Sequence, residues 1–233
     1  MPHKRRKIVL VIVEGLSDET ALGQAFEALF DPDNVRIKVV HGDITADFGS
    51  KPSNIVASVG NLVKNWAIKY GLKYRDFLRV IHITDTDGAY IPDENVIEND
   101  DHRGRPEYTE ANIVASPKSK VRERNARKRA CLNRLSSTQF VWKKVPYSIY
   151  FMSCNIDHLL YGVQNSDDET KRQNAFRFAT KYKDDFAEFV KYISNPDIAV
   201  TGGYKETWEY IRQGLNSLHR HTNLNLCFQC PER

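Results

Sequence analysis

The feature of this sequence that most constrains its fold is a run of apolar, mostly β-branched residues that ends in two aspartates. Residues 80–84 read Val-Ile-His-Ile-Thr, and Asp85, Thr86, Asp87 and Gly88 follow directly. Such a run predicts a buried strand. Because alternate residues of an extended chain point to the same side, we expect Asp85 and Asp87 to project together from the strand end. Two carboxylates this close repel each other unless a cation lies between them, so the pair predicts a site for a hard divalent ion.

A second apolar run, Lys7–Val13, also ends in an acid, Glu14, and here too a glycine follows. The uninterrupted apolar pattern is typical of a strand that is covered on both faces. Helical spacing follows over Thr20–Phe30, and Ser17 is the expected N-cap of that helix. A strand, a glycine turn and a helix in this order form the opening of an α/β unit.

Strands and helices continue to alternate along the chain. This spacing predicts a largely parallel sheet with right-handed crossovers. We therefore expect an α/β fold with a Rossmann-like, mostly parallel sheet that is flanked by helices. Further strands are expected at Val35–His41, Arg75–Thr84 and Tyr147–Ser153, and further helices at Ser53–Tyr70 and Asp157–Tyr161.

The acids at the strand ends are expected to form one site. Carboxyl ends of parallel strands lie along one edge of a sheet, and sites in open α/β sheets assemble at that edge. Glu14 should therefore meet Asp85 and Asp87 there. Three carboxylates beside a helix N-terminus can hold one or two magnesium ions, with water and a substrate phosphate completing the coordination.

The segment 89–134 departs from the alternating pattern. Residues 89–117 are acidic and without clear periodicity, which indicates a long functional loop. Residues 118–134 are expected to form a helix in which eight lysines and arginines face one glutamate. Such a helix neutralises phosphates without reading base sequence, although a solvated face or a docking surface for a partner is the alternative. The candidate nucleic-acid-binding residues are Lys118, Lys120, Arg122, Arg124, Arg127, Lys128 and Arg129.

Composition is that of an ordinary globular protein. Hydrophobic residues make up 41% and charged residues 27% of the 233 residues, which argues against wholesale disorder. We predict a catalytic domain over 1–165, with 89–134 as an insertion, and an aromatic-rich helical elaboration over 166–233 that packs on it. No apolar run reaches the roughly 20 residues that span a bilayer, and no signal peptide is recognisable. We therefore expect a cytoplasmic protein without a membrane partner.

The C-terminal tail contains four residues of types that bind zinc: His219, His221, Cys227 and Cys230. The two cysteines have an acceptable spacing, but a His-x-His pair so close to them is unusual for a zinc site. A loosely ordered terminus is the preferred interpretation, and zinc is not expected here.

Together, the strand-end motifs resemble the Toprim domain. Val13-Glu14-Gly15 with Ser17-Asp18, followed after a crossover by Ile83–Gly88, is similar to the acidic motifs of that family. The family includes type IA and type II topoisomerases, bacterial primases, small ribonucleases that mature ribosomal RNA, and OLD-family nucleases. The resemblance covers roughly residues 7–157.

The resemblance implies roles for individual residues. Glu14 would be a general acid/base or a metal ligand, and Asp85 and Asp87 would bind Mg²⁺ or Mn²⁺. Asp18 corresponds to an acidic position that some nuclease members use for metal. Asp157, after the last expected strand, is a further acidic candidate.

The implied activity is Mg²⁺-dependent hydrolysis of phosphodiester bonds in DNA or RNA. No topoisomerase tyrosine domain, primase zinc module or ATPase domain fits into the remaining chain, so a stand-alone nuclease in anti-phage defence or nucleic-acid processing is expected. One alternative is an effector or binding module that needs a separately encoded ATPase. Another is a nucleotide-sugar or phosphate-ester enzyme that uses Asp85 and Asp87 as its metal motif.

Overall fold

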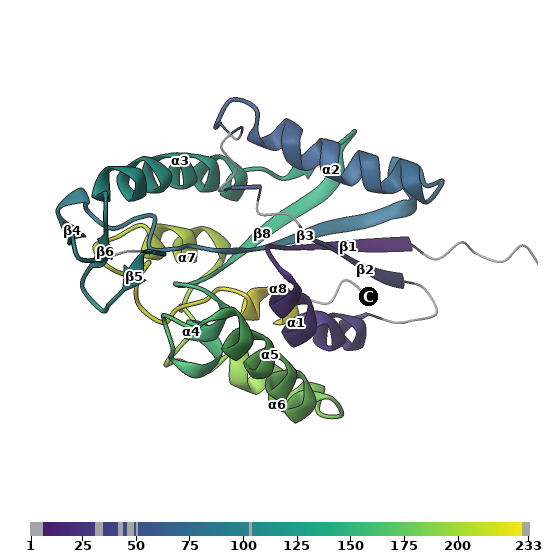
Figure 1. Cartoon of the computed structure of the whole chain (residues 1–233). Helices are drawn as coiled ribbons and strands as arrows, with labels where there is room; N and C mark the ends of the chain where they lie inside the picture. Colours follow the sequence, from purple (N-terminus) through teal and green to yellow (C-terminus); the bar gives the residue numbers. More distant parts are fainter. Residues whose placement is uncertain are drawn as a thin grey trace, which may run out of the picture.

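The computed structural model of this chain describes residues 7–30, 35–41, 44–45, 49, 51–102 and 104–229. These residues form an α/β fold around a five-stranded sheet with the order β2-β1-β3-β8-β7 (Figure 1). Four of the strands are parallel, and the short edge strand β7 is antiparallel to its neighbour. The strands are β1 (Lys7–Val13), β2 (Val35–His41), β3 (Phe77–Asp85), β7 (Phe140–Val141) and β8 (Val145–Met152).

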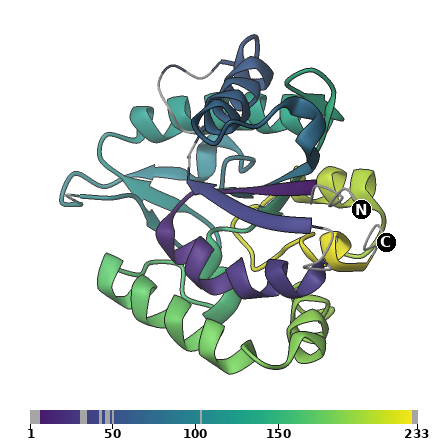
Figure 2. The same ribbon diagram turned by 90° about the vertical axis from the view of Figure 1, so that its right-hand side faces the viewer.

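The inner strand β1 shows how the core is built. Val9 and Val11 belong to one buried cluster, and Leu10 and Ile12 belong to another on the opposite face. The strand is apolar and buried from Ile8 to Val13, as expected where helices cover both faces. On one side lie α1 (Leu16–Leu29), α5 (Asp168–Tyr182), α6 (Phe186–Ile193) and α8 (Asn225–Gln229), and on the other α2 (Ile55–Lys69), α3 (Lys118–Ser136) and α7 (Tyr204–Ile211) (Figures 1 and 2).

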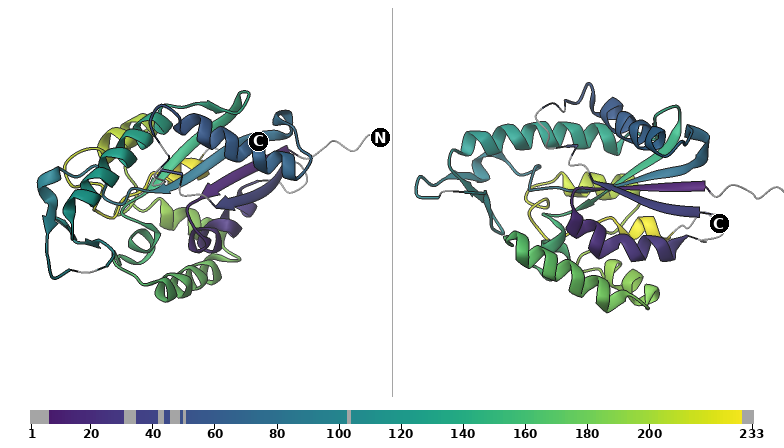
Figure 3. Two further views of the ribbon diagram at one scale, coloured as in Figure 1. Left: turned by 45° about the horizontal axis from the view of Figure 1, so that its top comes forward. Right: turned by 45° about the vertical axis from the view of Figure 1, so that its right-hand side comes forward.

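A second, three-stranded sheet lies beyond the carboxyl ends of β1 and β3 (Figure 3). It consists of β4 (Val96–Glu98), β5 (Glu107–Tyr108) and β6 (Ile113–Ala115) in the order β4-β6-β5. The prediction of a loop without secondary structure over 89–117 is therefore wrong. Strands of two or three residues are too short to show a period, and they pack around a small core of their own (Ile91, Val96, Ile113, Ala115, Val121 and Leu218).

The remaining elements follow the sequence prediction closely. The main strands begin and end within two residues of the predicted limits, and Gly71 follows α2 in the left-handed conformation that ends many helices. Helix α4 (Ile156–Tyr161) begins one residue earlier than predicted, and the 3₁₀ turns are η1 (Tyr74–Asp76) and η2 (Asp93–Asn95). Every helix among the described residues is too short or too polar to cross a membrane.

Candidate functional site

The turn after β1 brings Glu14 to the edge of the sheet. Helix α1 starts at Leu16 with Gly15 as its N-cap, so the prediction of Ser17 as N-cap is wrong. The capping carboxylate is Asp18 instead, because its Oδ2 accepts a hydrogen bond from the Gly15 amide at 2.8 Å. A carboxylate at this position also suits the positive end of the helix dipole.

The turn after β3 carries the aspartate pair. Asp85 is the last residue of β3, but Asp87 has a φ of +49°, so the strand does not continue through it. The strand alternation on which the prediction relied therefore does not extend to Asp87. The turn is anchored instead by backbone hydrogen bonds, in which the amides of Thr86 and Asp87 donate to the carbonyls of Met152 and Cys154, both at 2.9 Å. Asp85 and Asp87 both line one cavity.

Gly88 allows this turn to close. Its φ is +63°, and a Cβ at this position would approach Leu218 Cδ2 to 2.7 Å and Ile113 Cδ1 to 2.9 Å. Both the backbone conformation and the lack of space therefore require glycine. The turn is consequently fixed between the end of β8, the small sheet and the C-terminal segment.

Glu14 is tied directly to the end of β3. Its Oε1 accepts hydrogen bonds from Thr84 Oγ1 at 2.8 Å and from the Asp85 amide at 3.0 Å. These bonds hold the two carboxylate-bearing turns together across neighbouring strands. The convergence of Glu14 with Asp85 and Asp87, expected from the parallel topology, is thus present in the structure.

Lys128 from α3 lies within this group of carboxylates. Its side chain is fully buried, with an exposed fraction of 0%, and its Nζ donates to Glu14 Oε1 at 3.3 Å and pairs closely with Asp87 Oδ2. Arg124, one turn earlier on α3, donates from Nη2 to the Asp87 carbonyl at 2.9 Å and from Nη1 to the Tyr108 hydroxyl at 2.8 Å. We call Glu14, Asp85, Asp87 and Lys128 the acid–lysine cluster.

The position of Lys128 corrects its predicted role. A fully buried amine that is paired with two carboxylates is not an open contact for a nucleic-acid backbone. Arg122 and Arg124 are also engaged internally, because Arg122 Nη2 donates to the Asp93 carbonyl at 2.6 Å. Lys120 is exposed, whereas Lys118, Arg127 and Arg129 are half-buried. Among the seven candidates, Lys120 thus fits the predicted role best.

The two aspartates of the pair differ in their electrostatic environment. Burial raises the pKa of Asp85 well above its usual value, and the charges of Glu14, Asp18 and Asp87 raise it further. Burial also acts to raise the pKa of Asp87, but the charges of Lys128 and Arg124 outweigh it, and that pKa falls below its usual value. Positive charge therefore outweighs burial at Asp87, whereas at Asp85 the charge of Lys128 is outweighed by burial and by the neighbouring acids.

Asp18 and Asp157 lie beside the cluster. Asp18 is buried, and burial raises its pKa to about 6, against the lowering effect of its hydrogen bond with Gly15. Asp157 is buried too; its Oδ1 accepts from Asn174 Nδ2 at 3.0 Å, and its Oδ2 has no hydrogen-bond partner. Asp18 lines a cavity at the site, whereas Asp157 lines neither of the two described below.

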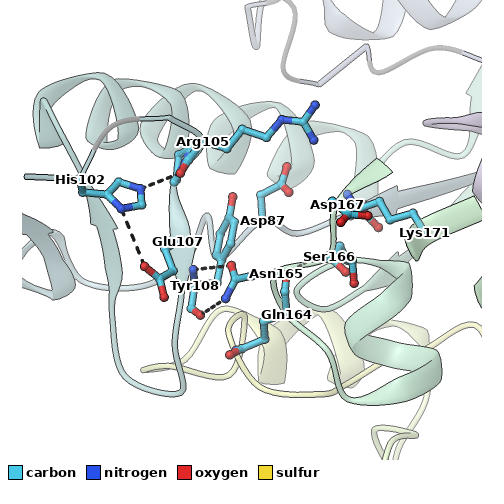
Figure 4. Close-up of a pocket in the computed structure, with 13 residues that line it drawn as sticks. Asp87, His102, Arg105, Glu107, Tyr108, Gln164, Asn165, Ser166, Asp167 and Lys171 are labelled. Atoms are coloured by element: carbon cyan, nitrogen blue, oxygen red, sulfur yellow. Dashed lines mark hydrogen bonds and ion pairs between the residues drawn. The ribbon is translucent and has the colours of Figure 1, made fainter. Parts of the chain in front are cut away.

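Two cavities open beside the cluster. One, of about 450 Å³, lies between the small sheet and the start of α5, and its wall includes Asp85, Asp87, Arg105 and Tyr108 (Figure 4). The other, of about 440 Å³, is lined by Glu14 and the N-terminal turn of α1. Both cavities share Asp85, Asn155 and Lys171, so they adjoin at these residues, and we call the two cavities together the groove.

An ion pair links the two sides of this groove. Arg105, beside the small sheet, donates two hydrogen bonds to Asp168 at the start of α5, at 2.8 and 3.0 Å. Arg105 lines the first cavity and Asp168 the second. Both side chains are largely exposed, so this pair contributes little to stability and can open at low cost.

The zinc-type residues of the tail do not form one group among the described residues. His219 donates to the Glu110 carbonyl at 3.1 Å, and His221 contacts the Tyr210 hydroxyl at 3.1 Å. Cys227 is buried in the core. Cys230 lies outside the described residues.

The fit of the acid–lysine cluster to a magnesium ion is partial. In the part of the chain that the structure describes, no three His, Cys, Asp or Glu side chains are arranged to hold a metal ion. Lys128 occupies the space between Glu14 and Asp87. Asp85 nevertheless keeps Oδ1 buried and without a hydrogen-bond partner, which leaves one ligand oxygen unused. Carboxylate oxygens are the ligands that Mg²⁺ prefers, so the donor chemistry fits once Lys128 releases its partners.

Sequence inspection missed four residues of the site: Lys128 as part of the cluster, and Arg105, Tyr108 and Lys171 in the groove. A signal for Lys128 was present, because Val121, Asn125, Lys128 and Leu132 follow helical spacing along one buried face. The other three have no comparable pattern.

Comparison with known proteins gives no match, whether with family models, with curated proteins or with solved structures.

Proposed function

We propose that this chain is a Toprim-like, Mg²⁺-dependent nuclease that hydrolyses phosphodiester bonds of DNA or RNA in the cytoplasm. The observation that carries the proposal is the convergence of Glu14, Asp85 and Asp87 at the carboxyl ends of neighbouring parallel strands. The raised pKa of Asp85 supports it, because acids that gather to bind a cation repel one another when the cation is absent.

The three carboxylates would hold the metal ion. When bound, Mg²⁺ would polarise the phosphate and lower the pKa of an attacking water. Glu14 takes part either as a ligand or in proton transfer. In the reaction the water oxygen bonds to phosphorus, the bond between phosphorus and the leaving sugar oxygen breaks, and that oxygen receives a proton.

The groove gives the substrate a path past the carboxylates. Lys171 lines both of its cavities, and its amine makes no hydrogen bond or ion pair with another described residue. A phosphate over Asp85 would therefore have a cation available at the junction of the cavities. Arg105 and Asp168 span the groove, so a strand either passes beneath their ion pair or opens it.

A cleavage assay tests this proposal. The wild-type chain is incubated with single-stranded and duplex DNA and RNA in Mg²⁺, in Mn²⁺ and in EDTA, beside Glu14→Gln and Asp85→Asn. We expect cleavage that requires the metal and that falls at least about a hundredfold in both variants. The control is Arg134→Met, an exposed change near the end of α3 that leaves the carboxylates intact. Cleavage that survives both acidic substitutions would contradict the assignment.

The position of Lys128 favours one second candidate, an effector that needs a separately encoded ATPase. With Lys128 between Glu14 and Asp87, the cluster is charge-paired rather than open. An activating partner could shift α3 and release the carboxylates. In that case the isolated chain would be inactive in Mg²⁺, and activity would appear when an ATPase encoded nearby is added.

A further inference from the structure

We infer that Lys128 is a resident counter-ion that holds the carboxylate turns together in the metal-free chain and gives up this role to a divalent cation. The inference rests on the metal-binding part of the proposed function. Its consequence is that the chain folds stably without metal because of Lys128. Without the lysine, folding stability would depend on the divalent cation.

The first observation that supports this role is the complete burial of the Lys128 side chain. Lysine is almost never fully buried unless it is paired, because removing an ammonium group from water is costly. Lys128 has an exposed fraction of 0%, and its Nζ contacts carboxylates from two separate turns, Glu14 after β1 and Asp87 after β3. The amine therefore bridges the same two turns that a metal ion in this site would bridge.

The second observation is the balance between the Lys128 amine and the three carboxylates of the acid–lysine cluster. One ammonium group faces three carboxylates, and it pairs with Glu14 and Asp87 but not with Asp85. Arg124, a second cation beside Asp87, directs its hydrogen bonds to the Asp87 carbonyl, Tyr108 and Asn125 rather than to a carboxylate of the cluster. Asp85 Oδ1 is thus left without a hydrogen-bond partner among the described residues, and a divalent ion would supply one.

The third observation is that packing fixes the backbone of α3 on both sides of Lys128. The helix is anchored by Leu132 and Leu135, which belong to the main core, and by Val121, which packs in the small sheet. The backbone of Lys128 is therefore fixed between two packed regions. Its four-carbon side chain can still change conformation, so the amine can leave the carboxylates while the helix stays in place.

Thermal unfolding of Lys128→Met, with Lys120→Met as the matched control, tests the inference. In EDTA we expect Lys128→Met to unfold roughly 10 °C below wild type, since removing the amine leaves the repulsion between the half-buried carboxylates unopposed. Adding Mg²⁺ or Mn²⁺ should recover most of that loss, whereas wild type and Lys120→Met should shift much less. Mn²⁺ titration should show binding to Lys128→Met at least about tenfold tighter than to wild type.

The outcomes separate this inference from the proposed nuclease. Equal metal-induced shifts in wild type and Lys128→Met would overturn it, even if wild type cleaves nucleic acid in Mg²⁺. If Lys128→Met does not fold in EDTA, it is refolded with Mn²⁺. Folding only with the metal supports the inference, and failure to fold under both conditions overturns it. Selective metal rescue without any cleavage would leave Lys128 as inferred and remove the nuclease proposal.

Discussion

The two carboxylate turns and helix α3 meet at the carboxyl ends of β1 and β3, but they hold charge in different ways. In the turns, backbone contacts fix the acids: Glu14 Oε1 accepts the Asp85 amide, and the Asp87 amide donates to Cys154. In α3, charge sits at the ends of long side chains, and the packing of the helix decides where each one points. Lys128 enters the cluster and Lys120 faces solvent, although the two residues lie only eight positions apart.

This difference has a consequence for function. Charge that the backbone fixes is preorganised, and preorganised charge is what a metal site or an active site requires. Charge on a helix face can serve as a structural counter-ion, as a brace or as a surface contact. Arg124 serves as a brace, because it connects the Asp87 carbonyl to the hydroxyl of Tyr108 in the small sheet.

The largest effects on cleavage and stability are expected for substitutions of Asp85 and Asp87, which lie in one turn but differ in their charge environment. Asp85→Asn and Asp87→Asn should both lose cleavage by at least about a hundredfold. In EDTA at pH 7 their stabilities should move in opposite directions. Asp87→Asn removes a partner of the buried Lys128 and should cost about 2–4 kcal/mol, whereas Asp85→Asn should raise the unfolding temperature.

The pKa of Asp85 explains why Asp85→Asn should raise the unfolding temperature. Because folding raises that pKa, the unfolded chain ionises Asp85 more readily than the folded chain does, and stability is lost as pH rises above the ordinary value of 3.8. Asp85→Asn removes this cost, so its advantage over wild type should be present at pH 7 and absent near pH 3. Unfolding curves across this range in EDTA measure it. A variant that is less stable than wild type at pH 7 would contradict the charge balance described for the cluster.

Smaller effects on stability and cleavage are expected when Arg124, the brace, is replaced. Arg124→Met leaves the Asp87 carbonyl and the Tyr108 hydroxyl without their donor, which should cost about 1–3 kcal/mol of stability and reduce cleavage about ten- to a hundredfold. Chemical unfolding and cleavage rates test this. Arg134→Met, an exposed change near the end of the same helix, is the control, and equal effects in the two variants would show that Arg124 is not a brace.

Lys171 in the groove should affect substrate binding more than chemistry. Lys171→Met is expected to raise KM roughly tenfold and to change kcat less, because the lysine lines both cavities without belonging to the acid–lysine cluster. Lys183→Met, an exposed change just after α5, serves as the control. A loss confined to kcat would place Lys171 in the chemical step instead.

The smallest effect is expected at the exposed face of α3. Lys120→Met should weaken nucleic-acid binding about twofold for every sequence and lower the slope of log affinity against log salt by about 1. Binding titrations at several salt concentrations measure this slope. An unchanged slope would remove α3 from the nucleic-acid contact surface altogether.

Much of this arrangement could be predicted from the sequence, for identifiable reasons. Glu14, Asp85 and Asp87 follow directly after long apolar strands, and parallel topology then brings strand ends together regardless of side-chain detail. The conformation of Asp87 could not be predicted, because it depends on a contact with Cys154, just after β8. The role of Lys128 was missed because counting charges along α3 ignored which face of the helix is buried.

The small sheet could not be predicted for a different reason. Its strands are two or three residues long, and their buried core includes Val121 from α3 and Leu218, which lies far away in the chain. The groove residues Arg105, Tyr108 and Lys171 depend on that sheet and on α5 for their positions. No local pattern encodes such long-range placement.

The most direct test of the central claim is a crystal structure of the chain soaked in Mn²⁺, with anomalous diffraction to locate the metal. We predict an anomalous peak for a Mn²⁺ ion bound by Asp85 together with Glu14 or Asp87. We also predict that the Lys128 amine has moved away from at least one of its two carboxylates. No peak at these carboxylates, with Lys128 still paired to both Glu14 and Asp87 and with the protein crystallised in a nuclease-active buffer, would contradict it.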